Sequence, residues 1–222
     1  MHKEQDSHNI IKIKAIDSVG AKRAKADRMS HDIIIIARHG KPALSRKIRL
    51  TWREYREWWK KYDIGGLAEN QKIPKKLKNL TGNADIVISS SLLRAKESAL
   101  LASGREPDFI YQDLIEAALP SPHLGPLKIR PKSWGTWSRI AWYIGWSDGM
   151  ESHKAARARA NKMCDVLAGH AKGGKIVYVS AHGWFNRMLK GSLMQRGWKC
   201  KSQNGDLHWS HRRFERPTGY GE

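Results

Sequence analysis

The sequence of 222 residues is poor in cysteine, in acidic residues and in long apolar runs. Its two cysteines, Cys164 and Cys200, are too few for a disulfide framework or a cysteine-rich metal site, so we expect reduced, structural thiols. No run of about 18 apolar residues occurs, which argues against a membrane-spanning helix. Residues 1–20 contain no apolar core of the kind found in secretory signals. We therefore expect a cytoplasmic protein.

The shortage of acidic residues leaves the chain strongly basic. It contains 41 Lys and Arg against 21 Asp and Glu, a formal net charge of +20. Such a surface attracts anions, whether phosphorylated metabolites, nucleic acid or the head groups of anionic lipids, and charge alone does not choose among them. Hydrophobic residues make up 40% of the chain, which is enough for one globular α/β domain with a sizeable core.

Short apolar runs alternate with helical patterns along the chain. The runs at 33–37, 85–89 and 176–180 have the composition of strands that are buried on both faces. Thr51 and Glu54 form a capping box at the start of a helix. The predicted helices span about 52–62, 69–80, 92–103, 151–170 and 184–195, with weaker strands at 109–111 and 206–214 and an irregular stretch at 120–149. This order predicts a layered α/β domain over residues 32–222 with a mostly parallel sheet, preceded by a flexible basic arm at 1–31.

Reactive side chains follow each of the three buried runs. Arg38 and His39 come after the first run, Arg94 lies just beyond the second, and His182 follows the third. Ligands in open α/β sheets bind outside the carboxyl ends of the strands. The sequence therefore predicts two histidines and two arginines at one edge of one sheet.

This combination of side chains suits phosphoryl chemistry. Arginine offers a planar fork of donors with a permanent charge, and neutral imidazole is a competent nucleophile at phosphorus. A second histidine can donate to the phosphoryl oxygens in the transition state. The leaving oxygen also requires an acid, for which Glu116 is our first candidate and Asp113 the alternative.

Five segments occur in the order, and in the strand or helix context, of one family's motifs: Arg38–Gly40, Ser89–Ala99, Leu114–Glu116, Gly149–Ser152 with Arg157 downstream, and Val179–Gly183. They span roughly residues 33–193. Together they resemble the histidine phosphatase, or phosphoglycerate-mutase-like, superfamily. The resemblance implies a three-layer α/β/α sandwich and a phosphohistidine mechanism without a metal ion or other cofactor.

The same resemblance implies a role for each matching residue. His39 would be the nucleophile, with Arg38, Arg94 and His182 holding the phosphoryl group and Glu116 donating the proton. Two further residues are candidates for substrate contact. Lys41 stands where many members of the family carry Glu or Gln, and Ser45 is the nearest polar residue to the position of a frequent Asn. Residues 117–120 lack the Gly-Trp-Glu-Gly-like segment of mutases, which favours a phosphatase.

Tryptophans and basic residues crowd the stretch between 120 and 149, and two interpretations remain open. The rings can simply pack this stretch onto the domain, since aromatic side chains bury a large area. Alternatively, they overhang the phosphate pocket and bind a bulky or lipid-like phosphoester, or contact an anionic membrane surface. We therefore expect a metal-independent phosphomonoester phosphatase, cytoplasmic or peripheral to the inner membrane surface, whose partner is a phosphorylated small molecule or lipid-like substrate.

Two other functions compete with this hypothesis. The first is a catalytically inactive module that binds phospho-ligands or anionic lipids on the same fold. The second is a basic nucleic-acid binder, although the chain contains no recognised nucleic-acid-binding motif. His208 and His211 do not add a metal site to these alternatives, because their spacing places them on opposite faces of the strand predicted at 206–214.

Overall fold

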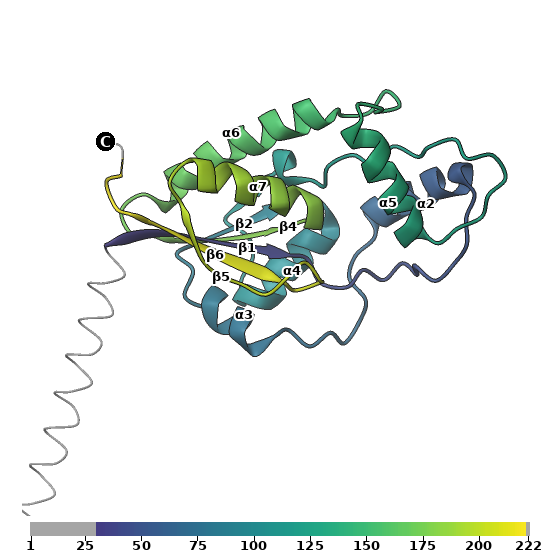
Figure 1. The fold of residues 1–222 in the computed structure, drawn as a ribbon. Coiled ribbons are helices and arrows are strands. Elements are labelled where there is room, and N and C mark those ends of the chain that lie inside the picture. Colours follow the sequence, from purple (N-terminus) through teal and green to yellow (C-terminus); the bar gives the residue numbers. More distant parts are fainter. Residues whose placement is uncertain (1–29, 221–222) are drawn as a thin grey trace, which may run out of the picture.

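The computed structural model describes residues 30–220, which form a six-stranded sheet in the order β3-β2-β4-β1-β6-β5 (Figure 1). Strands β3, β2, β4 and β1 are mutually parallel, whereas β6 is antiparallel to both β1 and β5. The mostly parallel sheet predicted from the sequence is therefore confirmed. The strands are β1 (His31–Arg38), β2 (Ile86–Ser90), β3 (Phe109–Tyr111), β4 (Ile176–Ala181), β5 (Lys199–Gln203) and β6 (His211–Pro217).

Helices cover both faces of the sheet, so the fold is the three-layer α/β/α sandwich that we expected. Helices α3 (Lys75–Thr81) and α4 (Leu93–Ser103) lie on one face, and α6 (His153–Ala171) and α7 (Gly183–Gln195) lie on the other (Figure 1). The isoleucine run of β1 serves both layers, because successive side chains of a strand point to opposite faces. Ile34 packs in the core cluster under α6 and α7, and Ile35 packs in the cluster under α3 and α4.

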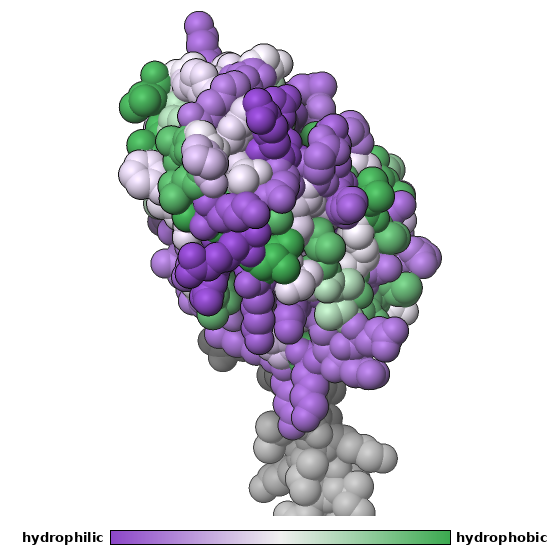
Figure 2. Space-filling view, turned by 90° about the vertical axis from the view of Figure 1, so that its right-hand side faces the viewer, coloured by the Kyte–Doolittle hydropathy of each residue, from purple (hydrophilic) through white to green (hydrophobic). Residues whose placement is uncertain are grey.

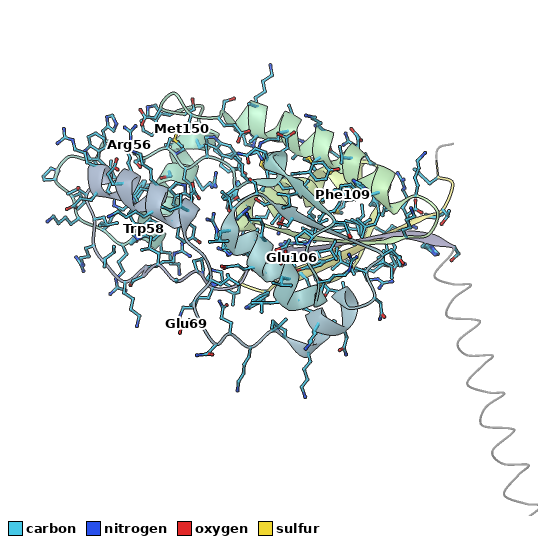
Figure 3. All side chains as sticks on the ribbon, turned by 180° about the vertical axis from the view of Figure 1, so that it is seen from behind. Arg56, Trp58, Glu69, Glu106, Phe109 and Met150 are labelled. Carbon is cyan, nitrogen blue, oxygen red and sulfur yellow. The ribbon has the colours of Figure 1, made fainter. Side chains whose placement is uncertain are left out.

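Two helices lie beside the sheet and pack on each other. They are α2 (Trp52–Ile64) and α5 (Pro131–Tyr143), which share a core of Tyr55, Trp58, Tyr62 and Trp134. The pair occupies one end of the molecule, and Trp58 of α2 lies far from Phe109 of β3 (Figures 1 and 3). A short 3-10 turn, η1 (Gln112–Leu114), follows β3.

The capping box of Thr51 and Glu54 is confirmed at the start of α2. The predicted limits of two other segments need correction. The helix predicted at 69–80 begins only at Lys75, because Pro74 precedes it and the Gln71 side chain is bonded to the backbone of Lys41. The stretch at 120–149 is not irregular throughout, since it contains α5. Pro131 is the first residue of that helix, a position where a missing backbone N–H is tolerated.

The strand predicted at 206–214 is also displaced. Strand β6 begins at His211 and is not at the edge, because β5 lies outside it. Residues 204–210 form the loop between these strands, so His208 is not on a strand and the opposite-face argument fails. The predicted arm at 1–31 falls outside the described residues except for Ser30 and His31, and His31 begins β1. Among the residues described, no helix is long and apolar enough to cross a membrane.

Candidate active site

The carboxyl ends of three neighbouring strands bring the predicted histidines together. Strand β4 lies between β1 and β2, and the backbone N–H of His39 donates to the carbonyl of Ala181, extending the β1–β4 pairing by one residue (3.0 Å). The ring centroids of His39 and His182 are 5.1 Å apart. Both side chains are almost fully buried, with 2% and 0% exposure. The sheet therefore holds two imidazoles side by side, away from bulk water.

The environment of His39 determines which ring nitrogen is free. Its Nδ1 lies 2.7 Å from the carbonyl oxygen of Gly40, and a carbonyl can only accept. Nδ1 therefore carries the hydrogen, and the lone pair is on Nε2. Burial lowers the pKa of His39 well below its ordinary value, and the nearby His182, Arg94 and Arg38 lower it further. A neutral ring with an available Nε2 is the form that can attack phosphorus.

His182 is held by the end of the neighbouring strand. Its Nε2 lies 2.9 Å from the Oγ of Ser90, the last residue of β2. Burial lowers the pKa of His182 well below its ordinary value, and Arg94 and Arg38 add to the effect. Its buried Nδ1 has no partner within the described part of the chain. The ring thus keeps one unpaired nitrogen next to His39, although the fully buried His182 is not among the residues that line the cavity described below.

Arg38 lies over the start of α7. Its Nη1 donates to the carbonyl of Asp206 at 2.7 Å, and its Nε has no partner among residues 30–220. A Cβ at Gly183 would lie 3.1 Å from the Nε and Cζ of Arg38. The glycine after His182 therefore allows the guanidinium to approach the N-terminus of α7, where backbone N–H groups favour anions.

Arg94 is wholly buried and is anchored to the end of α2. Its Nη1 donates to the carbonyl of Tyr62 at 2.8 Å, and its Nη2 pairs with Oδ1 of Asp63 at 3.1 Å. Its guanidinium also lies 4.5 Å from the ring centroid of Tyr62. The Nε is unpartnered in the described structure. Arg94 consequently links the strand-end site to the helix pair beside the sheet.

Glu116 is bound by the first amides of α7. Its Oε2 accepts from the N–H of Trp184 at 3.1 Å, and its Oε1 accepts from the N–H of Phe185 at 2.9 Å. The side chain lines the same cavity as His39. Asp113, the alternative acid, instead pairs with Lys162 at 2.9 Å and does not line the cavity. Of the two candidate acids, therefore, only Glu116 lines the cavity.

The cavity has a volume of about 590 Å³ and extends from the strand ends to the helix pair. Arg38, His39, Arg94 and Glu116 line its inner end. The remaining walls combine charged side chains with aromatic and aliphatic ones. The aromatic and aliphatic residues include Tyr55, Trp59 and Tyr62 from α2, Ile140 and Tyr143 from α5, and Trp184 from α7. Within residues 30–220, no group of three or more His, Cys, Asp or Glu side chains is arranged to hold a metal ion.

Lys41 and Ser45 do not line this cavity. The backbone of Lys41 is bonded to the Gln71 side chain, and its own side chain is exposed. Ser45 is exposed, and its carbonyl accepts a hydrogen bond from the indole N–H of Trp58. This bond fixes the loop, and the next residue, Arg46, lines the cavity. Of Lys41, Ser45 and Arg46, only Arg46 lines the cavity.

The sequence profile of the histidine phosphatase superfamily (branch 1) matches residues 34–215. The chain belongs to this superfamily. By family it is a histidine phosphatase. No curated protein sequence matches it significantly.

Solved structures share the fold of this histidine phosphatase at low identity. A phosphoserine phosphatase from Entamoeba histolytica, in complex with phosphoserine, is 14% identical with a TM-score of 0.54 and covers 84% of this chain and 95% of its own. A mycobacterial glucosyl-3-phosphoglycerate phosphatase is 19% identical (TM-score 0.51; 74% and 80% covered). A mycobacterial hydrolase is 16% identical (TM-score 0.51; 87% and 85% covered).

Several cavity residues of this histidine phosphatase were not predicted from its sequence. Arg46, Arg139 and Arg187 add positive charge to the walls, and Asp206 lies at the inner end. Asp206 accepts from Arg187 and Arg212 through its carboxylate. The spacing of Trp134, Ser138 and Trp142 along one face could have indicated α5, and with it Arg139. The loop residues carry no periodic signal.

His208 is another residue whose position the sequence did not indicate. Its ring centroid lies 5.7 Å from that of His39. Burial lowers the pKa of His208 to about 4, with Arg38, Arg46 and Lys41 contributing. A third neutral imidazole therefore borders the histidine pair.

Proposed function

We propose that this histidine phosphatase hydrolyses phosphomonoesters that carry a bulky apolar group, through a phosphohistidine formed on His39. The observation that carries the proposal is the free Nε2 of a buried, neutral His39 at the inner end of a cavity that also contains Arg38 and Arg94. Permanent guanidinium charges stabilise the phosphoryl oxygens, and His182 adds a further donor.

The reaction balances in two steps. In the first, Nε2 of His39 bonds to phosphorus, the bond from phosphorus to the ester oxygen breaks, and protonated Glu116 gives its proton to that oxygen, so the alcohol leaves. In the second, water attacks phosphorus and gives a proton to the Glu116 carboxylate. The bond between phosphorus and Nε2 then breaks and inorganic phosphate leaves. No step requires a metal ion.

The walls of the cavity support a bulky or lipid-like leaving group. Ile140, Tyr143 and Ile144 of the α5 region line the cavity and are also 49%, 54% and 81% exposed, so its apolar surface continues to the outside. Trp137, Ile140 and Ile144 follow the spacing of one helix face. Figure 2 shows hydrophobic side chains surrounded by hydrophilic ones at this end of the molecule. Contact with an anionic membrane surface is part of this proposal.

The first test is the hydrolysis of p-nitrophenyl phosphate in the presence of EDTA, with and without vanadate. We expect metal-independent turnover that vanadate inhibits, and a loss on the order of 1,000-fold or more in His39→Ala because no nucleophile remains. His170→Ala is the matched control, because His170 lies in the last turn of α6, is bonded to Tyr111 and does not line the cavity. It should retain the wild-type rate.

The competing functions give different results. A wild-type protein that binds inorganic phosphate but turns over no phosphomonoester between about pH 5 and 8 would be a binding module. Salt-sensitive binding of nucleic acid that survives in His39→Ala would indicate a nucleic-acid binder. Either result would overturn the proposed function.

A further inference from the structure

The segment that carries Glu116 has no regular secondary structure, and two arginines from different helices hold it on both sides. Residues 115–120 form neither helix nor strand. On the N-terminal side, Nη1 of Arg159 donates to the carbonyls of Asp113 and Ile115, at 2.7 and 3.0 Å. On the C-terminal side, Nη2 and Nη1 of Arg139 donate to the carbonyls of Ala117 and Ala118, at 2.9 and 2.7 Å.

Each arginine also contacts the ring of a residue whose amide holds the Glu116 carboxylate. Arg159 lies 4.2 Å from the ring centroid of Phe185, whose N–H donates to Oε1 of Glu116. Arg139 lies 4.9 Å from the ring centroid of Trp184, whose N–H donates to Oε2. The two guanidiniums therefore tie the backbone around the acid to the helix N-terminus that binds its carboxylate.

The arginines are themselves fixed in place. Arg159 makes a two-point ion pair with Glu151, with both nitrogen–oxygen distances at 2.7 Å. Arg139 is only 8% exposed and also lies 4.8 Å from the ring centroid of Trp142 on its own helix. A planar fork held in this way can satisfy two carbonyls at once, whereas a lysine at the same position cannot reproduce the geometry.

We infer that Arg139 and Arg159 are positioning residues for the proton donor, and that Arg139 couples the substrate-binding wall to it. Arg139 projects from α5 and lines the cavity, so one side chain contacts both the leaving-group side of the cavity and the Glu116 segment. The inference rests on the proposed function, in which Glu116 protonates the leaving oxygen.

The test compares leaving groups of different basicity. p-Nitrophenolate leaves without a proton, whereas an alkoxide needs one. Arg139→Lys and Arg159→Lys should therefore lower kcat/KM for octyl phosphate by about 30-fold or more, within the range of a lost general acid. For p-nitrophenyl phosphate the loss should stay below about threefold. Glu116→Gln serves as the reference and should show the same selectivity.

Arg196→Lys is the control for loss of a partly buried guanidinium. Arg196 pairs with Asp165 at the end of α7 and contacts neither the acid segment nor the cavity. It should leave both substrates unaffected. Thermal denaturation of every variant separates misfolding from misplacement of the acid, and the two arginine positions give independent tests if one variant fails to fold.

The outcomes distinguish a failure of the positioning role from a failure of the role assigned to Glu116. If Glu116→Gln is selective but both arginine variants lower the two substrates equally, or lower neither, the positioning role is overturned and the proposed function stands. If Glu116→Gln itself shows no dependence on the leaving group, Glu116 is not the donor and the inference is overturned, whereas hydrolysis through His39 is decided separately by His39→Ala.

Discussion

At the scale of single residues, the site depends on keeping two histidines uncharged. His39 and His182 are buried side by side, and the charges of Arg38 and Arg94 oppose protonation of both rings. Burial is the largest cause, because a charged imidazole loses its hydration there. The arrangement that attracts a phosphoryl dianion therefore also keeps the nucleophile in its reactive form.

This environment predicts that stability falls as the pH is lowered. The folded pKa of His39 lies well below its ordinary value, so the unfolded chain takes up a proton near pH 6.5 that the folded chain does not. Below about pH 6, each such histidine removes about 1.4 kcal/mol of stability per pH unit. We expect His39→Gln to reduce this slope by about that amount, measured by urea denaturation between about pH 7.5 and 5.

His182→Gln provides a second, independent measurement of the same effect. An unchanged slope in both variants would mean that the folded protein protonates these rings as readily as the unfolded chain does. The burial of two neutral imidazoles near Arg38 and Arg94 would then not hold in solution.

At the scale of secondary-structure elements, α5 supplies one wall of the cavity, and the proposed function makes that wall the site of the ester's apolar group. Trp134 fixes the helix against α2 by packing on Tyr55 and by donating its indole N–H to the carbonyl of Leu50 at 2.7 Å. The opposite side of the helix turns Ile140 toward the cavity and, with Ile144 beyond its end, leaves apolar surface exposed. The packing interpretation of the tryptophan-rich stretch is therefore confirmed for Trp134 and Trp142, which are fully buried. None of its tryptophans lines the cavity, and binding of an apolar ester or a membrane by this stretch stays a prediction.

We expect kcat/KM for alkyl phosphates to rise with chain length, because each buried methylene contributes about 0.8 kcal/mol, or roughly fourfold. The double variant Ile140→Ser with Ile144→Ser should flatten this dependence while leaving the rate with ethyl phosphate within about twofold, since a short chain does not reach the outer wall. Steady-state kinetics from ethyl to dodecyl phosphate measure both. A variant that keeps the full chain-length dependence would rule out α5 as the apolar wall.

At the scale of the whole molecule, the chain has a formal net charge of +20, and arginines line its cavity as well. Hydrophilic side chains dominate the face seen in Figure 2. A cleft of one sign focuses the electric field and raises the rate at which oppositely charged ligands enter. We therefore expect a dianionic substrate to be attracted toward the site before any specific contact forms.

Added salt should weaken this attraction. We expect kcat/KM for p-nitrophenyl phosphate to fall about 3- to 10-fold between roughly 20 and 200 mM NaCl, as the Debye length shrinks from over 20 Å to below 8 Å. Sucrose at equal osmolarity is the control and should have little effect. Rates that respond equally to salt and to sucrose would show that the charge of the molecule plays no part in substrate capture.

The local sequence by itself determined the sheet centre and the reactive side chains at its edge. An unbroken isoleucine run such as the one before Arg38 and His39 is typical of a strand that is buried on both faces. In a parallel sheet the carboxyl ends of neighbouring strands lie at the same edge, so the residues that follow them meet there. The same reasoning applied to the strand before His182. It also indicated that an acid such as Glu116 follows β3, although not that α7 amides would hold it.

Only the tertiary structure decided which side chains complete the cavity. Arg46 reaches it because the indole of Trp58 fixes the loop, and His208 approaches His39 through a loop between two strands that the sequence pattern did not separate. Arg139 and Arg159 find their carbonyl partners on a distant segment without secondary structure. Such contacts join residues that are far apart in the chain. Because every residue has a backbone carbonyl, no local pattern in the sequence indicates which carbonyls will accept from these arginines.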